Sequence, residues 1–310
     1  MPRTARIKSN TAIYHVIMRS ISDFNLFKNN IDKNKYLQLI KKYKQIHMFK
    51  LYAFCLMDTH VHLLIDSNGA DISTFMHKIN QCYAQYYNKK YKRNGHVFGD
   101  RFKSKIATTD VSVMCISAYI HNNPKDIRGY QNFVKNYNYS SFGIYLGKKK
   151  DIYDILDYEF LINYFSNDPL LGIKRYYKFV KFRTNSNIDN LPLDEFNLEK
   201  ISHSHKAPKI SPIRKLNPNE IIKLISNLCD FNIKSLKKNY SKDTLDFNSL
   251  CIFFIHILSN TSIIGTCRFL HNINSSNVYK LFHRGYNLIY KNNKYNNLLN
   301  SILKLDYIKC

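Results

Sequence analysis

The sequence predicts an α+β protein, with a ferredoxin-like split βαβ domain followed by an all-α domain that contains a helix-turn-helix. Three observations predict this plan. Residues 1–130 alternate between strand and helix patterns in the order β-α-β-β-α-β-α, which is the order of split βαβ folds. A polar segment rich in Asn, Ser, His and Pro follows at residues 184–212. Beyond it, the apolar residues recur at helical spacing.

The elements of the first domain follow from the spacing of its apolar residues. Residues 71–90 form the clearest helix, because apolar and aromatic side chains recur there every three or four positions. The last helix is expected to begin with Asp110 as its N-cap and to stop before Pro124, with Asn123 leaving the helical backbone region. The other predicted elements are strands at 13–19, 50–57, 60–65 and 103–108 and a helix at 32–47.

The rest of the chain is predicted to divide into three parts. Residues 131–183 are expected to pack on the first domain as a helical extension. Residues 184–212 are expected to form a linker, and residues 213–310 the helical domain. The first domain, residues 1–130, would then hold the chemistry discussed below.

The helical domain begins with a recognisable cap, in which Asn217 is the N-cap and Glu220 completes a capping box. Its last predicted helix carries Asn277, Lys280 and Arg284, whose side chains can contact phosphates and base edges. A compact helical domain that does not bind DNA would show the same pattern, so both interpretations remain open. The predicted helices are 218–229, 246–258, 262–270 and 275–284, with a helix-turn-helix across residues 271–274.

The charge of the chain predicts a polyanionic partner. Lys and Arg number 47 against 22 Asp and Glu, which gives a formal net charge of +25. The excess is concentrated in residues 1–150, which hold 25 Lys and Arg against 8 Asp and no Glu. An AT-rich genome would raise the lysine content, but it would not remove glutamate from a whole domain. Nucleic acid is therefore the expected partner, ahead of a membrane surface.

Several classes of protein are excluded by what the sequence lacks. The basic start of the chain is not followed by the apolar core of a signal peptide. The longest apolar run, near residues 251–258, is far shorter than the roughly 20 residues that span a membrane. The seven cysteines are scattered without a CxxC pair, which argues against a disulfide framework and a zinc ribbon. We expect a cytoplasmic protein with reduced cysteines.

The most informative residues are two histidines, His60 and His62, in an apolar strand-like run. Alternate side chains of a strand share a face, so both imidazoles can point at one metal ion. Tyr119 and Asn123, four residues apart in a helical segment, can likewise share a face. Two imidazoles, an amide oxygen and a phenol could together cut a phosphodiester and hold the cut end covalently. His121 falls on another helix face and is not expected to bind the metal. Taken alone, a His-x-His pair is more often incidental than metal-binding.

Five blocks of sequence carry a resemblance to a known family. They are AIYHV at 12–16, FCLMDTHVHLL at 54–64, YAQYYN at 83–88, GHVFGDRFKS at 95–104 and YIHNNP at 119–124. Together these blocks resemble the REP-associated tyrosine transposases, a family of HUH single-strand endonucleases. The resemblance covers roughly residues 2–150. The C-terminal part is only loosely similar to the DNA-binding domain of the replication initiator DnaA.

The resemblance implies a transposase that acts on single-stranded or hairpin DNA. Tyr119 would attack a DNA phosphate and leave a 5′-phosphotyrosine and a free 3′-hydroxyl. His60, His62 and Asn123 would bind a divalent metal ion. The donor atoms alone suggest zinc or manganese, whereas the family suggests magnesium or manganese, which we adopt. Whether the protein forms a homodimer stays open.

Positive side chains are expected to follow the substrate backbone, with Tyr and Phe among them that could stack unpaired bases. A solvated charged surface would have the same composition. Arg3 and Arg6 are a further candidate pair, as a basic arm that similar proteins use to read a hairpin. The candidate DNA-contacting residues of the first domain are Lys89, Lys90, Lys92, Arg93, Arg101, Lys103 and Lys105.

Three alternatives remain beside a strand transferase. The protein could be a non-catalytic DNA-binding regulator that uses its helix-turn-helix. It could be a hydrolytic two-metal nuclease, for which Asp58 and Asp66 flank the histidines. It could also act in replication initiation or conjugation with the same chemistry.

Overall fold

The computed structural model describes residues 12–21, 24–184, 214–233, 241–270 and 273–305. The chain forms two compact units, residues 1–207 and 208–310. Arg3, Arg6 and nearly all of the predicted linker lie outside the described residues. Among the helices that the structure describes, none is long and apolar enough to cross a membrane.

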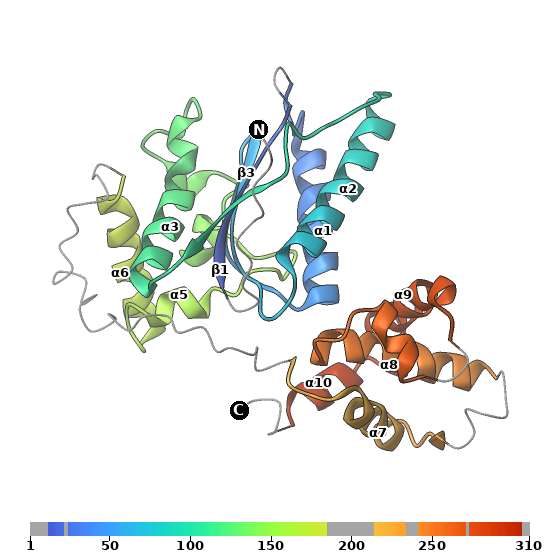
Figure 1. The fold of residues 1–310 in the computed structure, drawn as a ribbon. Helices are drawn as coiled ribbons and strands as arrows, with labels where there is room; N and C mark the ends of the chain where they lie inside the picture. The colour runs from blue at the N-terminus through green and yellow to red at the C-terminus, as the bar shows by residue number, and fades with distance from the viewer. Residues whose placement is uncertain (1–11, 22–23, 185–213, 234–240, 271–272, 306–310) are drawn as a thin grey trace. The chain divides into compact units, whose positions relative to one another are not determined.

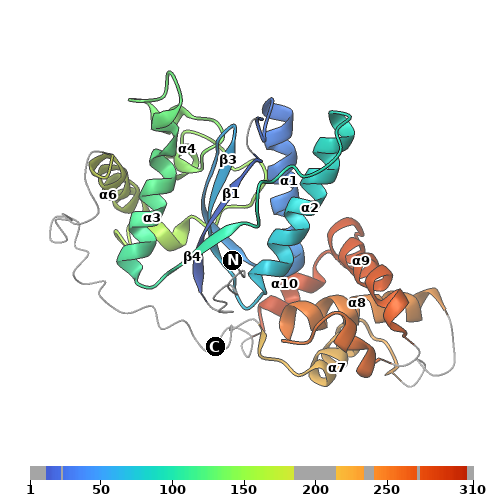
Figure 2. The ribbon, with the colours of Figure 1, turned by 45° about the horizontal axis from the view of Figure 1, so that its top comes forward.

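The N-terminal unit is built on a four-stranded antiparallel sheet in the order β2-β3-β1-β4. The predicted β-α-β-β-α-β-α order is confirmed, and each boundary falls within two residues of its predicted position. Helices α1 and α2 cover one face of the sheet and α3 lies on the other, as both ribbon views show (Figures 1 and 2). The elements are β1 (Ile13–Arg19), α1 (Asn30–His47), β2 (Lys50–Leu56), β3 (His60–Asp66), α2 (Ile72–Lys90), β4 (Lys103–Ala107) and α3 (Asp110–Asn122).

The predicted N-cap of α3 was wrong by one residue. Thr109, not Asp110, caps the helix, because Thr109 and Ser112 each bond the other's backbone N–H at 3.1 Å in a capping box. Asp110 lies in the first turn, where its carboxylate accepts a hydrogen bond from the Tyr164 hydroxyl at 2.9 Å. The reciprocal threonine–serine pair satisfies two backbone donors, whereas an aspartate cap would satisfy one.

A buried carboxylate joins the two helices on the first face. Asp32 is fully buried near the start of α1 and accepts hydrogen bonds from Lys90 at 2.6 Å, Tyr91 at 2.7 Å and Tyr86 at 3.0 Å. Burial opposes ionisation, but these donors more than compensate and lower the pKa of Asp32. The network ties the N-terminus of α1 to the C-terminal end of α2 beside the sheet.

Residues 131–183 pack on the second face of the sheet, together with α3. Their buried aromatic side chains join residues of β2 and α3 in one hydrophobic core. The extension also pairs with the outer edge of β2, since the Leu56 N–H donates to the Tyr139 carbonyl at 2.8 Å and the Ser141 N–H to that of Phe54 at 3.0 Å. The 3₁₀ turn η1 (Asn123–Asp126) leads from α3 to the extension. The elements of the extension are the 3₁₀ turn η2 (Val134–Asn136) and helices α4 (Phe142–Tyr145), α5 (Glu159–Asn163) and α6 (Pro169–Phe182).

The C-terminal unit is helical where it is described, and its first helix begins with the predicted capping box of Asn217 and Glu220. The predicted helix at 262–270 was wrong, because only a 3₁₀ turn forms at 264–268. Ser262 and Thr266 bond nearby backbone groups with their side chains, which competes with α-helical bonding. Residues 271–272 of the predicted turn lie outside the described residues. The elements are α7 (Pro218–Leu228), α8 (Lys242–Leu258), η7 (Ile264–Arg268), α9 (Ser275–Lys291) and α10 (Leu298–Leu303).

A glycine sets the close approach of α8 and α9. A Cβ atom added at Gly285 of α9 would overlap the Ser249 carbonyl oxygen and lie 2.9 Å from the Phe253 Cβ atom, both in α8. A backbone carbonyl cannot move aside as the end of a long side chain can. Any larger residue at this position must therefore push the two helices apart.

We expect Gly285→Ala to destabilise the C-terminal unit by about 1–3 kcal/mol, the usual cost of overpacking. The direction of the change in stability is informative, because helix propensity alone would make the alanine variant more stable by about 1 kcal/mol. Hydrogen exchange of the α8 and α9 amides in increasing urea measures the change. The exposed Asn287→Ala in the same helix is the matched control. An unchanged or more stable Gly285→Ala variant would contradict the close approach.

Candidate functional site

The strand register brings three histidines to one face of the sheet. In the pairing of β1 with β3, Ile17 lies opposite His62, Arg19 opposite His60 and His15 opposite Leu64. Because side chains alternate along a strand, His15 shares its face with His60 and His62. This is the face on which α3 lies.

Tyr119 on α3 closes the group of rings over this face. Its ring centroid lies 5.6 Å from that of His62 and 5.7 Å from that of His15, both edge-on. His60 and His62 are 5.0 Å apart by the same measure. Tyr119 is 53% exposed, whereas His62 is buried. The structure therefore places an accessible phenol directly beside one of the two predicted metal-binding histidines.

In both predicted metal ligands, His60 and His62, the Nδ1 atom takes part in a hydrogen bond. His60 Nδ1 lies 3.0 Å from the Thr59 hydroxyl, and His62 Nδ1 lies 3.0 Å from His15 Nε2. The Nε2 atoms of His60 and His62 form no hydrogen bond with any described residue. Each ring thus has one nitrogen left for a metal ion.

Asn123 is oriented so that its side-chain oxygen is available. Its Nδ2 donates to the Tyr119 carbonyl at 2.8 Å, which identifies the nitrogen end of the amide. The Oδ1 atom has no hydrogen-bond partner among the described residues. Two imidazole nitrogens and an amide oxygen fit a divalent ion of intermediate softness such as Mn²⁺. No group of three His, Cys, Asp or Glu side chains that could hold a metal occurs in the described part of the chain, so a site here needs this amide.

The backbone expected at Asn123 was wrong. Its φ of −53° and ψ of −35° remain helical although Pro124 follows. The chain tightens into the 3₁₀ turn η1, in which the Asn123 N–H donates to the Ile120 carbonyl. This geometry keeps Asn123 one turn above Tyr119, as a helical spacing requires.

Burial and nearby positive charge keep the imidazoles neutral. Burial lowers the pKa of His62 to about 3, with further contributions from His15, His60 and Arg19. Burial also lowers the pKa of His15 to about 4, assisted by Lys105. The pKa of His60 is lowered by burial and by Arg19, against the opposing effect of Asp126. Neutral imidazole is the form that binds a metal ion.

The last turn of α3 is fixed by buried polar contacts with the extension. His121 Nε2 lies 2.7 Å from the Ser141 hydroxyl, and its Nδ1 lies 2.7 Å from that of Tyr176. Asn122 donates to the Val180 carbonyl at 2.9 Å. His121 points away from the histidines on the sheet, into the core made by the extension. These contacts hold the turn that carries Tyr119.

The predicted DNA-contacting residues of the first domain differ in exposure and in their partners. Lys103 and Lys105 are exposed on β4, and their register with Ile17 and His15 puts them on the histidine face. Lys90 instead pairs with the buried Asp32 at 2.6 Å. The remaining positions add three exposed side chains, Lys89, Lys92 and Arg101.

Two other predicted contacts are engaged within the protein. The Arg93 guanidinium lies 4.1 Å from the centre of the Phe24 ring. In the C-terminal unit, Arg284 forms an ion pair with Asp246 of α8. Asn277 and Lys280 are exposed on α9.

Asp58 and Asp66, the two carboxylates considered for a two-metal nuclease, are bonded to other groups of the protein. Asp58 pairs with Lys33 at 2.7 Å. Asp66 accepts a hydrogen bond from the Tyr52 hydroxyl at 3.0 Å and another from the Asn68 N–H at 2.8 Å. The hydrolytic alternative therefore lacks free carboxylates at these two positions.

Sequence analysis assigned no function to three residues of this site. His15 and Thr59 contact the two predicted ligands, and Arg19 lies opposite His60 on the neighbouring strand. The alternation of β1 places His15 and Arg19 on one face, which is a signal visible in the sequence. Which face of β1 meets the His60–His62 face depends on the pairing register, and that is not visible in the sequence.

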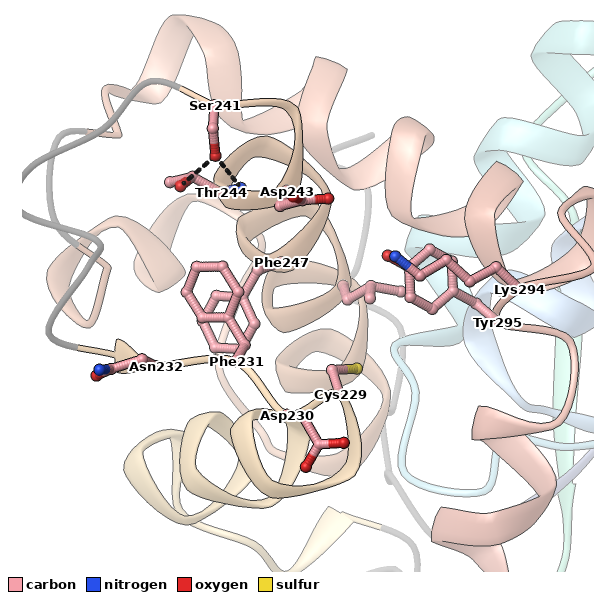
Figure 3. Close-up of a pocket in the computed structure, with 11 residues that line it drawn as sticks. Cys229, Asp230, Phe231, Asn232, Ser241, Asp243, Thr244, Phe247, Lys294 and Tyr295 are labelled. Atoms are coloured by element: carbon pink, nitrogen blue, oxygen red, sulfur yellow. Dashed lines mark hydrogen bonds between the residues drawn. The ribbon is translucent and has the colours of Figure 1, made fainter.

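The C-terminal unit contains a pocket of about 360 Å³ that is separate from these residues (Figure 3). The rings of Phe231 and Phe247 stack within it at 4.2 Å. Ser241 bonds Thr244 there, which is explained by its role as the N-cap of α8. We assign this pocket no function.

Comparison with known proteins finds similarity in the N-terminal unit. Residues 8–123 match the family model described as "Transposase IS200 like". The chain is also similar to a solved structure described as "Structure of the REP associates tyrosine transposase bound to a REP hairpin", at 15% identity and a TM-score of 0.42. That similarity covers 48% of this chain and 87% of the other. No curated protein matches the chain. The family model therefore supports, for residues 8–123, the transposase family expected from the five sequence blocks.

We expect the N-terminal unit to lose stability in acid, partly because of His121. Burial lowers the pKa of His121 to about 3 from 6.5. Below pH 6.5 the histidine takes up a proton in the unfolded chain, whereas in the folded chain it stays neutral down to about pH 3. The free energy of unfolding therefore decreases as the pH falls from 6.5 to about 3. The loss is at most about 1.4 kcal/mol per pH unit.

The measurement is the free energy of unfolding in urea between about pH 7 and about pH 5. Toward about pH 5 the slope for His121→Gln should become shallower than that of the wild type by up to about one proton, whatever its absolute stability. His77→Gln, at an exposed histidine, is the matched control. Equal slopes in wild type and His121→Gln would refute the assignment.

Proposed function

Since residues 8–123 of this chain belong to the IS200-like transposases, we propose that it is a DNA strand transferase that nicks single-stranded or hairpin DNA through Tyr119. The observation that carries the proposal is the contact of Tyr119 with the histidine face. An exposed phenol lies 5.6 Å, ring to ring, from His62, one of two histidines whose Nε2 atoms are left for a metal ion.

The proposed chemistry is a transesterification. The phenolic oxygen of Tyr119 attacks the phosphorus of a DNA phosphodiester, and the bond from phosphorus to the 3′-oxygen breaks. The phenol gives up its proton, and the leaving 3′-oxygen takes one up to become a hydroxyl. The 5′-phosphate remains on Tyr119. A phenol, with an ordinary pKa near 10, is a better leaving group than an alkoxide, so a 3′-hydroxyl can later reverse the step.

His60, His62 and Asn123 would hold Mg²⁺ or Mn²⁺ beside the nucleophile. Such an ion polarises the scissile phosphate and offsets the charge that develops on it. The neutral state of the buried histidines and the free Oδ1 of Asn123 support this ligand set. Lys103 and Lys105 would contact the phosphates that flank the cut, because they are exposed on the same face.

A second candidate function is DNA binding without cleavage. The exposed Asn277 and Lys280 on the first turns of α9 favour it, because such side chains can contact DNA. Arg284 fits this role less well, since it is already paired with Asp246. In this case Tyr119 would have no chemical part, so the experiment below distinguishes the two functions.

We expect Tyr119→Phe to abolish the covalent adduct and to leave DNA binding intact. The assay incubates the protein with labelled single-stranded hairpins from the flanks of its gene, with Mn²⁺ or Mg²⁺, and separates adducts on a denaturing gel. The stability should change by less than about 0.5 kcal/mol, because Tyr119 is exposed. Tyr158→Phe, at a 44% exposed tyrosine, is the matched control. Cleavage without an adduct would make water the nucleophile and overturn the mechanism.

Removal of divalent ions should stop adduct formation reversibly. A chelator is expected to abolish the adduct, and added Mn²⁺ or Mg²⁺ should restore it in the wild type. His60→Ala should respond to neither addition, because one of the proposed ligands is gone. Adduct formation that persists in the chelator would contradict the metal-binding role.

A further inference from the structure

We propose that His15 is a positioning residue that holds His62 in the tautomer able to bind the metal ion, by accepting a hydrogen bond from its Nδ1–H. The inference rests on the function proposed above and extends it to a residue of β1. Its basis is the 3.0 Å contact between His15 Nε2 and His62 Nδ1.

The two nitrogens of a neutral imidazole carry one proton between them, so the contact has two possible arrangements. If His62 donates, its proton is on Nδ1 and the Nε2 lone pair is free. If His15 donates, the proton of neutral His62 must sit on Nε2, and that atom cannot bind a metal ion. Only the first arrangement makes His62 a ligand through Nε2, and it requires His15 to carry its own proton on Nδ1.

The neighbouring ligand has an equivalent support. His60 Nδ1 lies 3.0 Å from the Thr59 hydroxyl, which can accept the Nδ1 proton in the same way. Both predicted ligands thus have a partner at Nδ1 and none among the described residues at Nε2. Partners of this kind fix the ring orientation and the tautomer of metal-binding histidines.

The surroundings of His15 suit an orienting role better than that of a ligand. Its ring lies edge to edge with that of His62, with centroids 5.3 Å apart and planes 24° from parallel, as the hydrogen bond between them requires. It also meets the Tyr119 ring edge-on at 5.7 Å. His15 is only 8% exposed and lies on a central strand paired on both sides. A ring held in this way constrains the metal ligand and the nucleophile together.

The first test reads the tautomer directly in the metal-free full-length protein. Nitrogen-15 NMR of the histidine rings distinguishes a proton on Nδ1 from a proton on Nε2. We expect His62 to carry its proton on Nδ1 in the wild type. A His62 ring protonated on Nε2 would overturn the proposal, whether or not the protein cleaves DNA.

The second test measures Mn²⁺ binding by electron paramagnetic resonance, without DNA and without a reading of activity. His15→Leu removes the acceptor and should weaken Mn²⁺ binding by about 10–100-fold. His15→Gln can place an amide oxygen near the position of Nε2 and should recover most of that loss. A Gln variant as weak as the Leu variant would show that the imidazole itself is needed, and would overturn the positioning role.

His47→Leu is the matched control. His47 is also a buried histidine, but it contacts Tyr43 and Phe75 of α1 and α2 on the opposite face of the sheet. It should leave Mn²⁺ binding unchanged. The proposed function would be refuted if the wild-type protein bound no Mn²⁺, or if His60→Ala bound it equally well. Wild-type binding that His15→Leu leaves unaltered would refute the role of His15 alone.

Discussion

The antiparallel pairing of β1 with β3 is the constraint on which the rest of this structure depends. Its register sets Ile17 against His62 and thereby puts His15 on the histidine face. A slip of one residue would turn every side chain of β1 to the opposite face. Tyr14, Val16 and Met18 would then leave the hydrophobic core under α1 and α2. The packing of this core therefore favours the register that brings the histidines together.

Helix α3 transmits this constraint from the sheet to Tyr119. One side of the helix lies on the strands and the other is held by the extension, through His121 and Asn122. Two layers therefore determine where Tyr119 stands, although Tyr119 itself is exposed and makes few contacts. An accessible side chain can be placed accurately in this way without being buried.

The sequence predicted what depends on local pattern. The strands, the helices of the first domain and the shared face of His60 and His62 follow from alternation and helical spacing within single segments. What it missed depends on partners distant along the chain. His15 meets His62 only through strand pairing, and Lys90 is held by Asp32, 58 residues before it. The cap at Thr109 and the 3₁₀ turn at 264–268 depend on which of several neighbouring polar side chains bonds the backbone, and the spacing of residues in the sequence does not decide this.

The two edges of the sheet are protected in different ways. An unpaired edge strand exposes N–H and C=O groups that can recruit another chain, which leads to aggregation. The extension occupies the edge at β2 through the backbone bonds of Leu56 and Ser141. The other edge, β4, is only five residues long and carries Lys103 and Lys105, whose charges repel a second copy of the strand. The same two lysines that would attract DNA thus oppose strand pairing between copies of the protein while none is bound.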